Sequence, residues 1–355
     1  MATIKMRPSE VSKCLEVAIS ENHPMMLSGP PGVGKTELVV QAAENVGAKL
    51  IISHPVVSDP TDYKGLPWVD SSVGHPVARF LPFSDLYRLV EAKGTTVFLL
   101  DDLGQAPPTV QAAAMQLILG RRINEIEVSD AVVFFACTNR REDKAGVQGI
   151  LEPVKSRFFT IVEVDTDVED WAKWAIKKGL PFDIINLMRW KPELLLNPKP
   201  SMVDMKNTPS PRTVYHAAKL IMAKYPEDLL PLMVAGAAGE AWMTEWQAWK
   251  RIQDQIPNVD KILNNPEKGD IPSEAHIMYA LCGALAERAN TRTFEAIVRY
   301  ANRISKESVD SKGKKASGKP EFSIMMIKDC LLKDPRIAKS KEYIDWQLAH
   351  KDVIM

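Results

Sequence analysis

The stretch Gly29-Pro30-Pro31-Gly32-Val33-Gly34-Lys35-Thr36 decides the fold of this chain. It fits the phosphate-loop pattern, in which a glycine and four further residues precede Gly-Lys-Ser/Thr. The short apolar run Met25 to Leu27 precedes the loop and predicts a strand. Residues 37–45 follow it and favour a helix, with Gly47 as a plausible C-cap. A strand, a glycine-rich loop and a helix in this order are the context that such a loop requires.

The loop predicts a site for a polyphosphate. Gly32 and Gly34 let the backbone approach a ligand closely and take positive φ, and the helix N-terminus adds a partial positive charge. We expect Lys35 to reach the β- and γ-phosphates and the Thr36 hydroxyl to ligate Mg²⁺. A chance glycine turn before a helix is the alternative, and the flanking pattern speaks against it. The residues expected at the nucleotide are Gly29, Pro30, Pro31, Gly32, Val33, Gly34, Lys35, Thr36 and Glu37.

Composition indicates a cytoplasmic globular protein. A length of 355 residues suggests two or three domains, and 45% hydrophobic with 25% charged residues is typical of globular chains. Lys+Arg and Asp+Glu both number 45, so no net field attracts the chain to nucleic acid or an anionic membrane. The longest apolar run, Ala131 to Cys137, is too short to span a bilayer, and no signal core begins the chain. Four widely spaced cysteines favour buried thiols in a reducing compartment.

Two further strands predict the rest of the site. Thr96 to Leu100 reads as a buried strand that ends in Asp101-Asp102, and ligands of parallel sheets bind at that edge. We expect Asp101 to hold Mg²⁺ through its water shell and Asp102 to orient or deprotonate the attacking water. A strand that ends in a solvated turn is the alternative. Residues 131–136 form another buried strand, after which Asn139 could contact the γ-phosphate or the water.

The alternation of strands and helices predicts an α/β fold. Residues 1–165 form a mostly parallel sheet with helices on both faces, and residues 166–225 an all-helical lid. Residues 226–355 form a C-terminal helical region, within which 305–320 is rich in Lys, Ser and Gly and predicts a disordered loop. Trp242, Trp246 and Trp249 recur at helical spacing, which favours packing between helices over a partner groove.

These motifs together resemble an AAA+ ATPase, and within that group the MoxR branch. The acidic pair is followed by Ala-Pro-Pro, one residue, Val-Gln and a helix, as in MoxR-type proteins. Thr138-Asn139 resembles the first sensor of the family, and Ser210-Pro211-Arg212 the second. The segment from Leu151 to Phe158 resembles the one that supplies an arginine finger. The resemblance covers roughly residues 10–224.

The resemblance implies a ring, usually a hexamer, with ATP and Mg²⁺ at the subunit interfaces. Arg157 would then reach the neighbour's site in trans, and Arg212 would reach the γ-phosphate in its own subunit. A surface salt bridge is the alternative for Arg157, and a solvated arginine at a helix start for Arg212. The chain departs from the family at Asp102, where most members have Glu, and at Ser156, where many have Asp.

The leading functional hypothesis is an ATPase that remodels or matures a partner protein in a chaperone-like role. MoxR-type enzymes usually work with a partner that carries a von Willebrand factor A domain. A nucleic-acid-directed motor or helicase loader is an alternative, supported only by the Lys-rich segment 305–320 and opposed by the neutral charge. A scaffold that binds ATP and hydrolyses it slowly is a third reading, because Asp102 is one methylene shorter than Glu.

Overall fold

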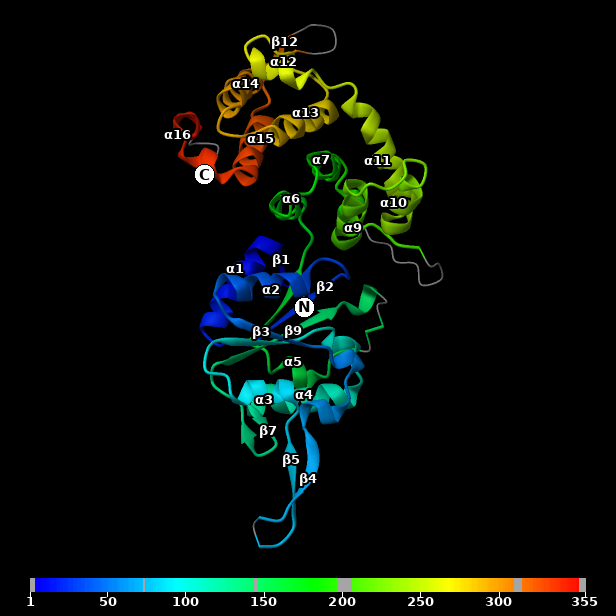
Figure 1. Ribbon diagram of the computed structural model, residues 1–355, viewed down its shortest axis with the longest axis vertical. Helices are drawn as coiled ribbons and strands as arrows, with labels where there is room; N and C mark the ends of the chain where they lie inside the picture. The colour runs from blue at the N-terminus through cyan, green and yellow to red at the C-terminus, as the bar shows by residue number, and fades with distance from the viewer. Residues whose placement is uncertain are drawn as a thin grey trace. The chain divides into compact units, whose positions relative to one another are not determined.

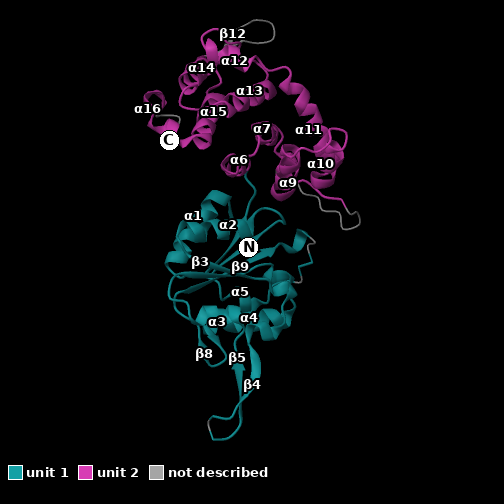
Figure 2. Ribbon diagram, in the orientation of Figure 1, with its two compact units in different colours: residues 1–167 teal, residues 168–355 magenta. Residues whose placement is uncertain are grey.

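The computed structural model describes residues 4–72, 74–143, 146–147, 149–196, 206–309 and 315–350. The chain forms two compact units, residues 1–167 and residues 168–355 (Figure 2). Unit 1 contains the glycine-rich loop, the acidic pair, Asn139 and Arg157, whereas unit 2 contains Arg212. Each unit has its own hydrophobic core.

Unit 1 is built on a six-stranded sheet in which all neighbouring strands are parallel (Figure 1). This arrangement confirms the predicted parallel α/β core. The order across the sheet is β1 (Lys5–Met6), β10 (Thr160–Val164), β2 (Met25–Gly29), β9 (Val132–Asn139), β6 (Thr96–Leu100) and β3 (Lys49–Ser53). The edge strand β1 was not predicted, because two residues carry no periodic signal.

Helices cover both faces of this sheet, as a parallel sheet requires. Successive residues of β6 alternate between the two layers: Val97 and Leu99 join one hydrophobic cluster, and Phe98 and Leu100 the other. The first cluster includes α1 (Pro8–Ser20) and α2 (Lys35–Asn45). The second includes α3 (Ser84–Val90), α4 (Pro108–Gly120) and α5 (Glu152–Lys155). All five residues of β6 are buried, which explains its continuous apolar run.

The strand order places the carboxyl ends of the central strands at one edge. In the register, Gly29 at the end of β2 pairs with Asn139 at the end of β9, and Leu100 of β6 pairs with Ala136 of β9. The chain runs from β2 to the far edge strand β3 and later returns to β10 on the other side of β2. Such a reversal of strand order creates the crevice where parallel sheets bind ligands.

Two antiparallel hairpins extend unit 1. The pair β4 (Leu66–Asp70) and β5 (Val77–Leu81) projects away from the sheet (Figure 1), and the exposed fraction of Trp68 on it is 64%. Gly74 lies between these two strands with φ of +84°, a conformation that glycine adopts at little cost. The shorter pair is β7 (Arg122–Ile123) and β8 (Ile126–Glu127). The 3-10 helices of the unit are η1 (Pro55–Val57), η2 (Pro60–Tyr63), η3 (Leu103–Gln105) and η4 (Arg141–Asp143).

Unit 2 is mainly helical and has one hydrophobic core, to which helices on both sides of residue 225 contribute. Trp242, Trp246 and Trp249 are at most 3% exposed, so the packing interpretation of these residues is confirmed. Gly239, with φ of +96°, separates two of the helices. The helices are α6 (Val168–Lys177), α7 (Phe182–Trp190), α8 (Glu193–Leu196), α9 (Pro211–Met222), α10 (Leu230–Ala238), α11 (Glu240–Gln253), α12 (Val259–Asn264), α13 (Ala275–Glu287), α14 (Phe294–Lys306), α15 (Pro320–Lys333), η5 (Pro335–Lys339) and α16 (Lys341–Ala349).

The segment 305–320, where a disordered loop was predicted, is described only in part. Residues of β11 (Glu307–Val309) pair antiparallel with β12 (Lys315–Ser317), and residues 310–314 lie outside the described ones. The sequence pattern missed this pair because a short hairpin ladder is held by backbone hydrogen bonds, which need no apolar periodicity.

Candidate functional site

The glycine-rich loop joins β2 to α2, as predicted. Gly32 has φ of +79° and Gly34 has φ of +100°, values that glycine adopts at little cost. Gly34 is the residue before α2, which begins at Lys35. The first backbone N–H groups of a helix have no partner inside it, so the loop brings donors to the carboxyl edge of the sheet.

Lys35 lies at the centre of the loop and is only 7% exposed. Its Nζ donates to the carbonyl oxygens of Gly29 at 3.0 Å and Pro30 at 3.1 Å. It also donates to Oδ1 of Asn139 at 2.7 Å, which joins the loop to the end of β9. The ammonium group is therefore held between two of the strand ends that sequence analysis assigned to the site.

Thr36 and Asp101 form the second contact of the cluster. The Thr36 hydroxyl lies 3.0 Å from Oδ1 and 2.9 Å from Oδ2 of Asp101. The hydroxyl and the carboxylate come from different elements, because Thr36 is in the first turn of α2 and Asp101 follows β6. Two oxygen ligands side by side suit a hard cation that takes its remaining ligands from phosphates and water.

Asp102 has a left-handed backbone, with φ of +57°. Aspartate tolerates this conformation better than most residues, because its short polar side chain can bond locally. Oδ1 of Asp102 accepts from Nε2 of Gln105 at 3.0 Å and from Nδ2 of Asn139 at 3.4 Å. Sequence reasoning missed Gln105, although its place three residues after Asp102, on a turn, was the available signal.

Asn139 connects the two halves of the cluster. Its Oδ1 must face the Lys35 ammonium, which only donates, and its Nδ2 then faces the Asp102 carboxylate, which only accepts. The orientation of the amide is therefore fixed by its neighbours. Behind it, burial and then the charge of Asp101 raise the pKa of the Cys137 thiol, which keeps this side chain neutral beside the site.

Arg157 has no hydrogen bond to this cluster among the described residues, and Arg212 belongs to the other unit. Nη1 of Arg157 donates to the hydroxyl of Ser156 at 2.9 Å, and its buried Nε has no hydrogen-bond partner among the described residues. Arg212 lies in unit 2, exposed in the first turn of α9, where Ser210 caps the helix by accepting from the backbone N–H of Thr213 at 3.2 Å. Glu37, also expected at the nucleotide, accepts from Nε2 of Gln41 at 2.9 Å.

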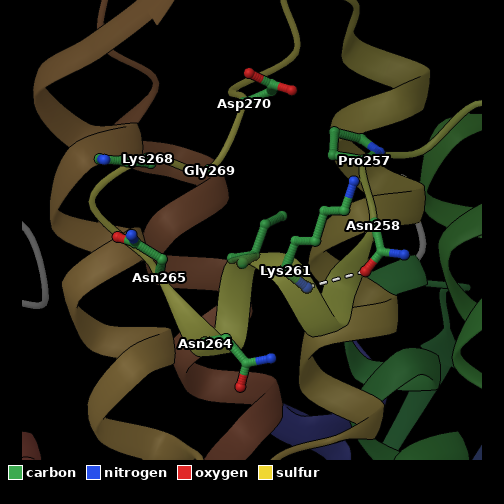
Figure 3. A pocket seen from close by; sticks show the side chains of 9 residues that line it. Pro257, Asn258, Lys261, Asn264, Asn265, Lys268, Gly269 and Asp270 are labelled. Carbon is green, nitrogen blue, oxygen red and sulfur yellow. Dashed lines mark hydrogen bonds between the residues drawn. The ribbon is translucent and has the colours of Figure 1, made fainter.

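Two surface hollows lie elsewhere on the chain. One of about 390 Å³ flanks α12 in unit 2, where Asn258 caps the helix by accepting from the backbone N–H of Lys261 (Figure 3). The other, of about 420 Å³, lies at the amino ends of β3 and β6 and includes Lys49 and Thr96. Because that edge of the sheet is opposite the glycine-rich loop, this second hollow does not belong to the cluster.

The residues fit a magnesium ion held jointly with a phosphate ligand. Over the described ranges no group of three or more His, Cys, Asp or Glu side chains could hold a metal by itself. Mg²⁺ in phosphate-transfer sites needs only one or two protein ligands, and Thr36 with Asp101 supplies a hydroxyl and a carboxylate.

Among the described helices, none is both long and apolar enough to cross a membrane.

Comparison with known proteins finds similarity over part of this chain. Residues 25–166 match the family model described as "ATPase family associated with various cellular activities (AAA)". Over 151 residues the chain is 30% identical to midasin of Giardia intestinalis. This aligned region is 41% of this chain and 3% of the length of midasin. Similar solved structures include the RuvB Holliday junction branch migration motor of Thermotoga maritima (17% identity, 89% of this chain and 92% of that chain, TM-score 0.38). NtrX of Brucella abortus in complex with ADP is another (13% identity, 75% and 63% coverage, TM-score 0.40).

Proposed function

We propose that this chain, whose residues 25–166 match the AAA ATPase family model, binds ATP with Mg²⁺ and hydrolyses it. The observation that carries the proposal is the contact of Lys35 with Asn139, beside the contact of Thr36 with Asp101. These groups come from three elements far apart in the sequence, and a purely structural turn would not need them together. The fold and the matching family support the same conclusion.

The proposed roles follow from the donors and acceptors present. Lys35 would exchange its bonds to the loop carbonyls for the β- and γ-phosphates, and the loop N–H groups would bind the same oxygens. Thr36 and Asp101 would hold Mg²⁺, which when bound neutralises charge on the phosphates. Both described hydrogen bonds to Asp102 go to Oδ1, so Oδ2 can accept a proton from the attacking water. Asn139 would orient that water or contact the γ-phosphate.

We further propose a ring of identical subunits, usually hexameric in the MoxR-type proteins that the motifs resemble. An interfacial role for Arg157 is supported by its half-buried guanidinium, whose Nε lacks a partner among the described residues. A neighbour's phosphate would give that group its missing acceptor. Arg212, in the first turn of α9, is the proposed second sensor. Remodelling of a partner protein, such as one with a von Willebrand factor A domain, is the proposed outcome of the cycle.

Phosphate release from ATP by the purified chain tests the proposed hydrolysis. We expect Asp102→Asn to lower turnover about 100-fold or more while leaving ATP binding intact, because the amide cannot accept the water's proton. Asp130→Asn, an exposed carboxylate away from the cluster, is the matched control and should be fully active. Hydrolysis at the parental rate in Asp102→Asn would rule out the assigned role of Asp102.

Mixing experiments test the ring. We expect two variants to be inactive alone and to regain activity when they are mixed. Arg157→Ala keeps an intact phosphate loop, and Lys35→Ala keeps an intact Arg157. Rescue requires that a site be completed in trans. An Arg157→Ala protein with full activity alone would exclude the finger role. In the same assay, stimulation by DNA that falls steeply with salt would instead favour the nucleic-acid-directed alternative.

A further inference from the structure

Arg140, the residue after Asn139, is tied down by several acidic groups. Its Nε and Nη2 form a fork on Asp143, at 3.0 and 2.7 Å. Its Nη1 lies 3.0 Å from Oε1 of Glu163 and 3.1 Å from Oε1 of Glu142. The hydrogen bonds to Asp143, together with the nearby charges, raise the pKa of Arg140 above its already high value. The side chain is 25% exposed, so it is a partly buried anchor.

Glu163 is the far end of this contact. It lies on β10, is 7% exposed, and is paired in register with Ser28 of β2 and Lys5 of β1. The Lys5 ammonium approaches it at 3.5 Å. A buried carboxylate is costly unless charged donors satisfy it, and the Arg140 guanidinium, at 3.0 Å, is the nearer of its two cations.

The ion pair crosses the strand that carries the glycine-rich loop. In the sheet, β2 lies between β9 and β10, so a contact from Arg140 to Glu163 spans the end of β2. Successive residues at a strand end point to opposite faces. Asn139 accordingly contacts Lys35 on one side, while Arg140 contacts Glu163 on the other. The end of β9 is thus held from both faces.

We propose that Arg140 is a positioning residue, which holds Asn139 in the orientation that reaches both Lys35 and Asp102. This inference rests on the proposed ATPase function. The bond from Nδ2 of Asn139 to Asp102 is already 3.4 Å long, near the limit for a hydrogen bond. A shift of a few tenths of an ångström at the end of β9 breaks it. The anchor on Asp143 and Glu163 prevents that shift.

Steady-state kinetics of Arg140→Gln, with Arg141→Gln as the matched control, tests this role. Arg141 is the next residue and is exposed, with no ion pair described for it. We expect Arg140→Gln to lower kcat about 10- to 100-fold, the effect of a small misplacement of a reacting group. The dissociation constant for ADP should stay within about twofold, because the phosphate loop is untouched. Glu163→Gln should cause a smaller loss in the same direction, since Asp143 still holds the guanidinium.

A double-variant comparison separates positioning from general stability. If Arg140 acts through Asn139, then Arg140→Gln should change kcat by less than about twofold in an Asn139→Ala background. An equal loss in both backgrounds would overturn the proposal, as would a kcat for Arg140→Gln equal to that of Arg141→Gln. Should Arg140→Gln melt below the assay temperature, Arg140→Lys takes its place. Lysine keeps the positive charge but cannot make both hydrogen bonds to Asp143. An unchanged kcat for Arg140→Lys would therefore refute the positioning role. An inactive parent protein would refute the proposed ATPase function, whereas these outcomes in an active one refute only the positioning role.

Discussion

Replacing Gly104 by alanine should disturb the end of β9 without touching a site residue. Gly104 is buried in η3, directly after the acidic pair. A Cβ at this position would lie 2.2 Å from Oγ1 and 3.3 Å from Cβ of Thr138. Thr138 is 5% exposed and precedes Asn139. Because a β-branched side chain has few rotamers, the hydroxyl cannot move away freely, and the strand itself must shift.

The cost can be worked from these contacts. Overpacking of a filled core costs about 1–3 kcal/mol. Rotation of the Thr138 hydroxyl would also break its 3.0 Å bond to the Asn139 carbonyl oxygen, which adds about 0.5–1.5 kcal/mol. The sum of about 1.5–4.5 kcal/mol corresponds to a fall in melting temperature of about 3–18 °C for a unit of this size.

Scanning calorimetry of the full chain measures this fall. Gly94→Ala is the matched control, because a Cβ there meets nothing within 4 Å. Removing the obstructing hydroxyl with Thr138→Ala should restore part of the lost stability in the Gly104→Ala background. If Gly104→Ala melts within about 1 °C of the control, the close approach to Thr138 has no energetic weight and the reasoning is wrong.

Three further predictions concern the loop and unit 2. Lys35→Ala should weaken binding of a fluorescent ADP about 100-fold or more, since charged hydrogen bonds to phosphate are lost; a nearly parental dissociation constant would contradict this. Arg189→Met should lower the free energy of unfolding of unit 2 by about 3–5 kcal/mol, because it leaves a buried carboxylate without its partner. Arg299→Met, which removes an exposed pair, should cost about 0–1 kcal/mol in the same urea titration, and equal losses would refute the distinction. Burial raises the pKa of Cys282 and Cys330, so the folded chain keeps both protons while the unfolded chain loses them. The contribution of these thiols to the free energy of unfolding should therefore be fully present below a pH of about 8.5. Above that pH, the free energy of unfolding should fall by up to about 1.4 kcal/mol per pH unit for each thiol. Replacing both thiols by alanine should lower that slope, to which buried Cys137 also contributes, and an unchanged slope would exclude Cys282 and Cys330 as a cause.

The core of the fold and most of the proposed site could be predicted from sequence. The glycine-rich loop is a local pattern, and parallel topology brings the ends of β2, β6 and β9 to one edge. Lys35, Asp101 and Asn139 therefore had to lie close together once the strands were recognised.

The contacts that depend on register could not be predicted in this way. The pairing of Arg140 with Glu163 requires knowledge that β10 lies next to β2, and nothing in either segment alone indicates it. The same is true of Arg189 and Asp329, which are 140 residues apart. Short elements without periodicity, such as β1 and the hairpin β11–β12, give no signal to find.

Arg189 also constrains how the chain can be shortened. Its side chain is 3% exposed and forms salt bridges with Glu169 of α6 and Asp329 of α15. A truncation that ends before α15 would remove Asp329, one of the two acidic partners of this guanidinium, together with the apolar side chains that α15 contributes to the core. The last helices are therefore part of the core of unit 2 and not a removable appendage, and a form shortened before α15 should be less stable than the full chain.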